Sequence, residues 1–269
     1  MHNPYFTKQL AILFALLTCS VLSACSMQPQ RPATGTFVKR MLTHDGATYS
    51  YQVFVPSQQA GGRHPPLILF LHGTGERGSD GDKPTQVGLG PYLHRHLVDF
   101  PALVVFAQAP DGRDWNGLAA TIAFAELEQV SGEFHGDRNR TYLTGLSMGG
   151  YGVWELALAQ PQRFAALVPI CGALRAPGDE RDLFVTQVAG QADPYAAVAR
   201  QLKSMPIWIF HGARDDLVLP RDDRLIHAAF QAAGSDARYT EFPDANHNAW
   251  DAAYATPELW QWLFAQHRR

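Results

Sequence analysis

The segment Gly145-Leu146-Ser147-Met148-Gly149-Gly150 contains the residues best suited to do chemistry. An apolar run at 141–143 precedes it and a helical pattern at 150–159 follows, so the serine falls on a strand-to-helix turn. Such a turn brings backbone close to Ser147 on both sides, and glycines two residues away avoid the clash that side chains would cause. The field at the helix N-terminus favours developing negative charge. The pattern predicts a nucleophilic serine, and the alternative is a glycine-rich turn before a helix.

A serine needs a base to take its proton, and the base needs an acidic group to orient it. Asp215 follows the apolar run at 207–210, and His247 follows the run at 239–242. The carboxyl ends of parallel strands meet at one edge of a sheet, so these side chains should converge there. We assign Ser147 as nucleophile, His247 as general base and then general acid, and Asp215 as the buried carboxylate that fixes the histidine tautomer.

Several other residues compete for these roles. Asp216 is adjacent to the assigned aspartate but should point in another direction, and Asp244 is expected to shape the turn of the histidine loop. His72 and His211 each precede a glycine at a strand end, where a histidine usually bonds nearby backbone. Cys171 follows a strand without a sharp turn, which favours a small buried residue over a nucleophile.

Charge that develops on a reacting carbonyl oxygen requires backbone donors aimed at it. The amide of Met148, directly after the serine, is one expected donor. The other is the amide of Thr74 in His72-Gly73-Thr74-Gly75, a loop that follows the apolar run at 67–71. Two neighbours of this loop, Glu76 and Arg77, are expected to brace it.

Trp115 lies in a polar loop, 109–116, that follows the apolar run at 103–106. This loop should reach the same edge of the sheet as the serine. An aromatic face there suits aryl esters or sugar rings, so Trp115 is a candidate substrate-binding residue. Alternatively, the indole packs underneath the loop.

The elements that must position these residues alternate between strands and helices. Strand-like runs occur at 37–42, 48–55, 67–71, 103–106, 141–143, 167–170, 207–210 and 239–242, and helical patterns at 119–134, 150–159, 222–233 and 257–267. The first two strands flank Asp45-Gly46, a hairpin signal. The others predict an α/β fold: a mostly parallel twisted sheet with helices on both faces and an N-terminal antiparallel hairpin. Glu126, Glu128 and Glu133 are expected on the solvent side of the helix at 119–134.

Composition excludes several classes of protein. The chain has 269 residues, of which 46% are hydrophobic, so it can bury a substantial core and is not disordered. Its net charge is −3, and it lacks the dense basic stripe that nucleic-acid binding requires.

The N-terminus resembles an export signal. A short apolar run at 10–22 ends in Leu22-Ser23-Ala24-Cys25, which is similar to the lipobox of bacterial lipoproteins. That resemblance implies cleavage before Cys25 and lipidation of its thiol. Ser26, in place of aspartate, implies an outer-membrane lipoprotein of the cell envelope, facing the periplasm or the exterior. We therefore divide the chain into a signal at 1–24, a tether at 25–36 and one catalytic domain at 37–269. The alternative is an ordinary secretory signal cut near Ala24.

Four segments together resemble the α/β-hydrolase superfamily: Leu71-His72-Gly73-Thr74-Gly75-Glu76-Arg77-Gly78, the serine segment, Pro161-Gln162-Arg163-Phe164-Ala165-Ala166 and His247-Asn248-Ala249-Trp250. The most similar group is the small esterases near dienelactone hydrolase, feruloyl esterase and polyhydroxybutyrate depolymerase, often labelled phospholipase/carboxylesterase or predicted peptidase. Ser147 replaces the cysteine of dienelactone hydrolase, so that enzyme's lactone chemistry is not carried over.

This resemblance implies a serine hydrolase that cleaves carboxylic esters through an acyl-enzyme, with no metal and no organic cofactor. Its substrate would be a small-molecule or polymer-linked ester. A serine peptidase would use the same residues, although the chain has no room for the β-propeller of prolyl oligopeptidases. A non-catalytic binding lipoprotein is the remaining alternative. The oligomeric state is not predicted.

Overall fold

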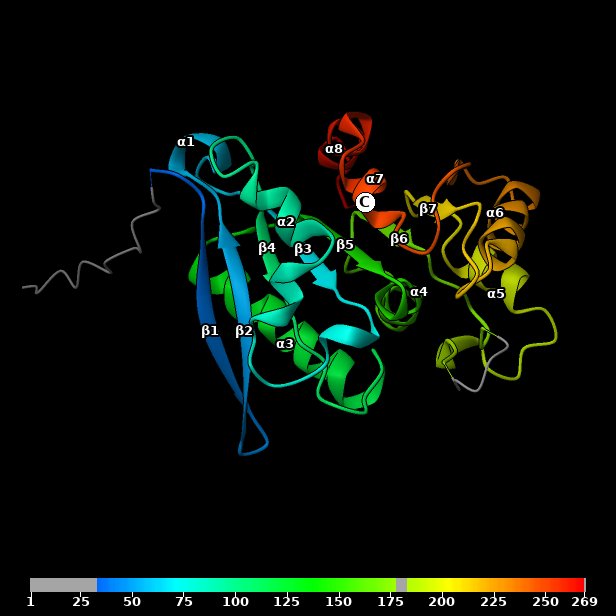
Figure 1. The fold of residues 1–269 in the computed structure, drawn as a ribbon, viewed down its shortest axis with the longest axis horizontal. Coiled ribbons are helices and arrows are strands. Elements are labelled where there is room, and N and C mark those ends of the chain that lie inside the picture. Colours follow the sequence, from blue (N-terminus) through cyan, green and yellow to red (C-terminus); the bar gives the residue numbers. More distant parts are fainter. Residues whose placement is uncertain (1–32, 178–182, 269) are drawn as a thin grey trace, which may run out of the picture.

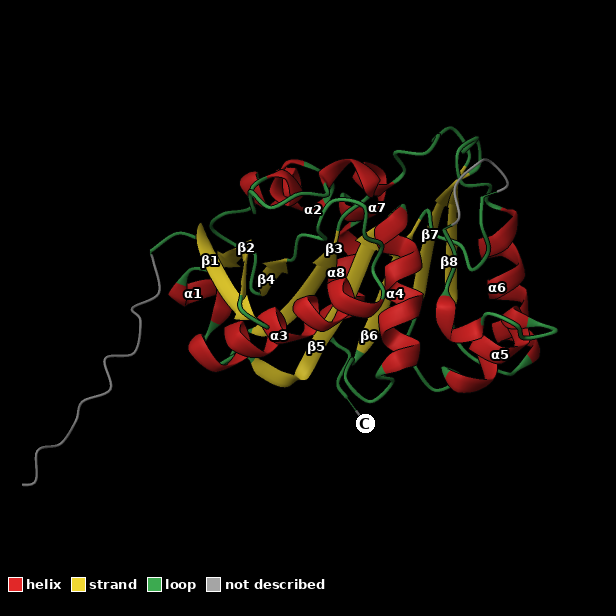
Figure 2. Cartoon of the chain, turned by 90° about the horizontal axis from the view of Figure 1, so that it is seen from below, coloured by secondary structure: helices red, strands yellow, loops and turns green. Residues whose placement is uncertain are grey.

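The computed structural model describes residues 33–177 and 183–268. The predicted signal, Cys25 and most of the tether lie outside these residues. Eight strands form one sheet in the order β1-β2-β4-β3-β5-β6-β7-β8 (Figures 1 and 2). Their bounds are β1 Thr36–His44, β2 Ala47–Val55, β3 Pro66–Leu71, β4 Leu103–Phe106, β5 Asp137–Leu146, β6 Ala166–Ile170, β7 Trp208–Gly212 and β8 Arg238–Phe242.

The pairing of the strands confirms the predicted fold class. β1 and β2 form an antiparallel hairpin, from Thr36 opposite Val55 to His44 opposite Ala47. Asp45 and Gly46, between the strands, both have positive φ, as a tight hairpin turn requires. β2 joins β4 in antiparallel fashion, and β3 to β8 all pair in parallel. β8 is the more polar run because it lies at the sheet's edge, where its side chains stay partly exposed.

Helices cover both faces of the sheet, as the alternating pattern predicted. The helices are α1 Gln58–Gly61, α2 Leu89–His94, α3 Gly117–Glu133, α4 Met148–Ala159, α5 Pro194–Gln201, α6 Arg221–Ala232, α7 Trp250–Tyr254 and α8 Pro257–Phe264. Residues of α3, α4, α5 and α6 share one hydrophobic core with the sheet. Residues of α2, α7 and α8 share the other core, on the opposite face (Figure 1).

The sequence prediction missed four short helices and misplaced one side chain. α1, α2, α5 and α7 have four, six, eight and five residues, too few for an apolar period to stand out. Glu126 was expected on the solvent side of α3, but it is completely buried. The cause is that α3 packs against the hairpin strands as well as against β3 and β4, so a wider arc of the helix is covered.

None of the helices in the described part of the chain combines the length and the apolar composition needed to cross a bilayer.

Candidate active site

Ser147 occupies the sharp turn between β5, which ends at Leu146, and α4, which begins at Met148. Its φ of 54° is unusual for a residue with a side chain. A Cβ on Gly149 would lie 2.0 Å from the Leu71 carbonyl oxygen, and one on Gly145 would lie 2.4 Å from that of Gly149. These approaches confirm that the turn needs glycine on both sides of the serine. The Ser147 amide donates to the Ile170 carbonyl at 3.0 Å, which ties the turn to the neighbouring strand.

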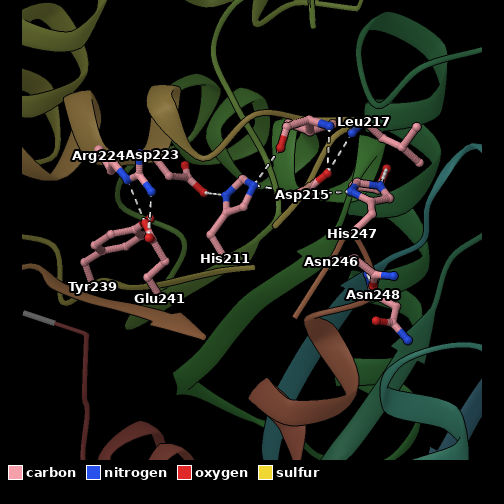
Figure 3. A network of polar contacts seen from close by, with 12 residues as sticks. His211, Asp215, Leu217, Asp223, Arg224, Tyr239, Glu241, Asn246, His247 and Asn248 are labelled. Atoms are coloured by element: carbon pink, nitrogen blue, oxygen red, sulfur yellow. Dashed lines mark hydrogen bonds and ion pairs between the residues drawn. The ribbon is translucent and has the colours of Figure 1, made fainter. Parts of the chain in front are cut away.

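The three residues assigned from sequence are joined by hydrogen bonds. The Ser147 hydroxyl lies 2.9 Å from Nε2 of His247. The other ring nitrogen of His247, Nδ1, lies 2.7 Å from Oδ2 of Asp215 (Figure 3). With Nδ1–H donating to the carboxylate, Nε2 is left as an acceptor for the serine proton. Ser147 is 8% exposed and the His247 side chain is 15% exposed, so both residues are largely covered but keep some contact with solvent.

Asp215 is buried and well satisfied as a carboxylate. Its Oδ1 accepts hydrogen bonds from the amides of Leu217 and Val218, at 3.0 and 2.9 Å. Burial opposes its charge, but the hydrogen bonds from His211 and His247 outweigh burial and hold the pKa of Asp215 below its usual range. Asp216, the competing residue, is exposed to solvent.

The loops that carry Asp215 and His247 are fastened to each other. Arg214 forms an ion pair with Asp244, and its amide donates to the Ala245 carbonyl at 2.9 Å. A Cβ on Gly212 would lie 2.2 Å from the Asn246 carbonyl oxygen, so only glycine allows the loops to approach this closely. This contact places the histidine next to its carboxylate.

The two expected backbone donors each stand at the start of a helix. Thr74 is the first residue of a 3-10 helix, Thr74–Glu76, and Met148 is the first residue of α4. Amides at the first positions of a helix have no acceptor within the helix, so both can serve a ligand. A Cβ on Gly73 would lie 3.5 Å from that of Ser147, which shows how closely the loop approaches the hydroxyl.

Buried side chains brace the loop that carries Thr74. His72 accepts the Ala109 amide at Nε2, at 3.0 Å, and burial lowers the pKa of His72 to about 4, so its ring is neutral. Trp115 is 2% exposed, and its indole N–H donates to the His72 carbonyl at 3.0 Å. The structure thus places Trp115 underneath the loop, which was the alternative to substrate contact. Arg77 also braces the loop, through an ion pair with Asp114.

Sequence reasoning missed Gln108 and Asp223. Gln108 accepts the Gly81 amide and donates to the Glu76 carbonyl, which holds the segment after the loop. A polar residue two positions after a buried strand was the available signal. Asp223 contacts His211 from the first turn of α6. An acidic residue in a first helical turn is ordinary, so no signal marked it.

Cys171 is buried, as expected, and its sulfur lies within 4.8 Å of ligand atoms of His211 and Asp215. These three groups could ligate a metal ion by type and distance. Nε2 of His211 and Oδ2 of Asp215 are already hydrogen-bonded to each other, to the Val218 carbonyl and to His247. A metal there would displace the bond that orients His247.

The sheet order, the serine turn and the Ser-His-Asp hydrogen bonds define this chain as an α/β-hydrolase, which confirms the predicted superfamily. Residues 122–267 match the Prolyl oligopeptidase family, and the chain belongs to that family.

Solved structures show the same fold. A thermostable esterase is 27% identical and has a TM-score of 0.67, with 86% of this chain and 63% of that one covered. The fluorophosphonate-binding serine hydrolase F of Staphylococcus aureus is 20% identical, with a TM-score of 0.66 and 86% and 98% of the two chains covered. A ferulic acid esterase is 18% identical, with a TM-score of 0.65 and 86% and 97% covered.

A curated relative, an uncharacterized secreted protein of Arthroderma benhamiae, is 25% identical over 210 residues. The match covers 68% of this chain and 21% of the relative, so the chain spans about a fifth of that protein's length.

Proposed function

We propose that this protein is a serine esterase that hydrolyses carboxylic esters through an acyl-enzyme intermediate. The Ser147 hydroxyl attacks the ester carbonyl carbon as its proton passes to Nε2 of His247. The carbon–oxygen bond to the alcohol breaks, and the alcohol leaves with that proton. Water, deprotonated by the same histidine, then attacks the acyl carbon. The bond from that carbon to the Ser147 oxygen breaks, the histidine returns the proton to that oxygen, and the acid is released. Asp215 stabilises the imidazolium that forms in both steps.

One observation carries this proposal: an unbroken row of hydrogen bonds from the Ser147 hydroxyl through His247 to Asp215. A serine at a sharp turn without a base would be a poor nucleophile. Here the base is in contact with the hydroxyl, and the carboxylate fixes the tautomer that can accept its proton.

The amides of Thr74 and Met148 are proposed to form the oxyanion hole. Met148 begins the twelve-residue helix α4, so the field of that N-terminus adds to its hydrogen bond. Thr74 begins a single 3-10 turn and would contribute its free amide. In hydrolases of this kind, the loss of one donor costs about 10²–10³-fold in rate.

The test is Ser147→Ala, assayed with a short p-nitrophenyl ester. We expect turnover to fall by about 10⁴-fold or more with the circular dichroism spectrum unchanged, because the nucleophile is lost and the fold is not. A fluorophosphonate probe should label the wild-type protein at Ser147 and leave the variant unlabelled. Wild-type turnover in the purified variant would rule out the assignment, and so would an active protein labelled at another residue.

A serine peptidase is the second candidate, because the chain belongs to the Prolyl oligopeptidase family. The same residues could attack an amide, whose nitrogen leaving group needs the proton from His247 more than an alcohol does. Matched ester and anilide substrates with one acyl group separate the two. The esterase proposal predicts the higher kcat/KM for the ester with no detectable anilide cleavage.

We further propose that the protein is exported and lipid-anchored through Cys25, with small-molecule or polymer-linked esters as its substrates. The lipobox-like residues before Cys25 support the anchor, and the secreted relative supports export.

A further inference from the structure

The polar network does not end at Asp215. His211 lies behind it and is completely buried, and both of its ring nitrogens face acceptor oxygens (Figure 3). Nε2 lies 2.8 Å from the Val218 carbonyl oxygen and 3.2 Å from Oδ2 of Asp215. Nδ1 lies 2.7 Å from Oδ2 of Asp223. The contacts form one row: Ser147, His247, Asp215, His211 and Asp223.

The chemistry of these partners determines where the protons lie. A backbone carbonyl only accepts hydrogen bonds, so Nε2 of His211 carries a proton. Nδ1 and the Asp223 carboxylate share a second proton. Asp223 is itself buried in the first turn of α6, where the helix N-terminus favours a negative charge. Its Oδ1 has no hydrogen-bond partner within the described residues, so the charge depends on His211 and on the helix.

Burial disfavours the charged form of both His211 and Asp223, and the hydrogen bonds between them favour it. Burial disfavours the charged form of His211, but the hydrogen bonds to Asp215 and Asp223 outweigh it and raise the pKa of His211 to about 10. Burial raises the pKa of Asp223 to about 6, although the bond from His211 opposes this rise. At pH 7 the pair is therefore an imidazolium and a carboxylate.

The other titratable groups around His211 and Asp223 do not supply a positive charge next to Asp215. Burial raises the pKa of the Cys171 thiol and of the Tyr239 phenol, so both are neutral. Glu241 forms an ion pair with Arg224, and Asp222 accepts a hydrogen bond from Tyr195. His211 is thus the buried cation in contact with Asp215.

We propose that His211 is a positioning residue that remains an imidazolium through the catalytic cycle, orienting Asp215 and reducing its attraction for a proton on His247. The inference rests on the proposed function, since it concerns the base of that reaction. An aspartate facing only His247 would stabilise the protonated form of that histidine more strongly. His247 would then stay protonated, and unable to act as a base, up to a higher pH. Sharing the carboxylate between two histidines keeps His247 free to accept the serine proton nearer neutrality.

The activity test compares two identical substitutions. His211→Gln keeps an N–H donor for Val218 but removes the positive charge behind Asp215. We expect the acidic limb of the kcat/KM–pH profile to move up by about one pH unit, with about a tenfold loss of kcat/KM below the new midpoint. The control is His227→Gln on α6, whose ring lies against Tyr239 and does not contact Asp215. Its profile should match the wild type. An unchanged midpoint in folded, active His211→Gln would overturn the proposal.

A second measurement needs no variant and so covers the case in which His211→Gln fails to fold. In the wild-type protein labelled with ¹⁵N-histidine, the His211 ring should show two protonated nitrogens that persist from pH 6 to pH 8. His72, the neutral buried histidine, provides the comparison within the same spectrum. Neutral-type shifts at His211 near pH 7 would overturn the proposal even in an active enzyme. Absence of esterase activity would contradict the proposed function. The spectrum would still test whether the His211 ring is charged.

Discussion

Asp215 links two histidines through one carboxylate oxygen, Oδ2, while its other oxygen binds backbone amides. Oδ1 is held by two backbone amides, which fixes the plane of the carboxylate. Oδ2 receives Nδ1–H of His247, which selects the one tautomer whose Nε2 can accept a proton from Ser147. An amide in place of this carboxylate would keep the shape but lose the charge and favour the wrong tautomer.

At the residue scale we therefore predict that Asp215→Asn lowers kcat for a p-nitrophenyl ester by about 10³–10⁴-fold while the protein stays folded. Asp216→Asn is the matched control, because this neighbouring side chain is exposed. It should retain nearly all of the wild-type kcat. The reverse ranking in steady-state kinetics would transfer the orienting role to Asp216.

At the scale of the elements, the site depends on how tightly strand ends and loops approach one another. α4 packs onto β5 and β6, and its first turn touches the end of β3 through Gly149. The Asp215 loop and the His247 loop also approach closely, and this approach requires glycine at position 212. The precision of the site thus comes from backbone contacts, in addition to side-chain hydrogen bonds.

We predict that Gly149→Ala lowers the free energy of unfolding by about 3 kcal/mol, because the new methyl group would meet backbone that cannot move aside. Gly132→Ala, near the end of α3, is the control. Nothing lies within 4 Å of its added Cβ, so alanine should raise stability by about 0.5–1 kcal/mol. Urea unfolding of both variants measures the difference, and equal stabilities would contradict the tight turn.

At the scale of the whole molecule, the helices that cover the sheet bury the carboxyl group of Glu126, and this burial lowers the stability of the fold. Both of its carboxylate oxygens are buried without a hydrogen-bond partner in the described residues, and the Tyr51 hydroxyl is in the same condition. Burial raises the pKa of Glu126 well above its usual range. A raised pKa means that the folded state prefers the protonated acid, so this residue penalises folding increasingly as pH rises above about 4.5.

Glu126→Gln should therefore raise the free energy of unfolding at pH 8 by about 1–3 kcal/mol and change it little at pH 4. The exposed Glu258 is the control, because Glu258→Gln should alter stability by the same small amount at both pH values. Denaturant titrations at the two pH values provide the comparison. A Glu126→Gln variant less stable than wild type at pH 8 would show that the buried carboxylate is satisfied.

Local sequence patterns were sufficient to predict the parallel sheet, the hairpin, and the placement of Ser147, Asp215 and His247 in the segments that follow strands. Continuous apolar runs, glycine spacing and chain order are local signals, and each reflects a steric or solvation requirement of its own segment. Only the tertiary structure decided that Trp115 lies under the loop that carries Thr74, that Glu126 is buried, and that Asp223 meets His211. These contacts join segments that lie far apart in the chain. They are determined by how helices, strands and loops pack against one another, and no local sequence pattern encodes that packing.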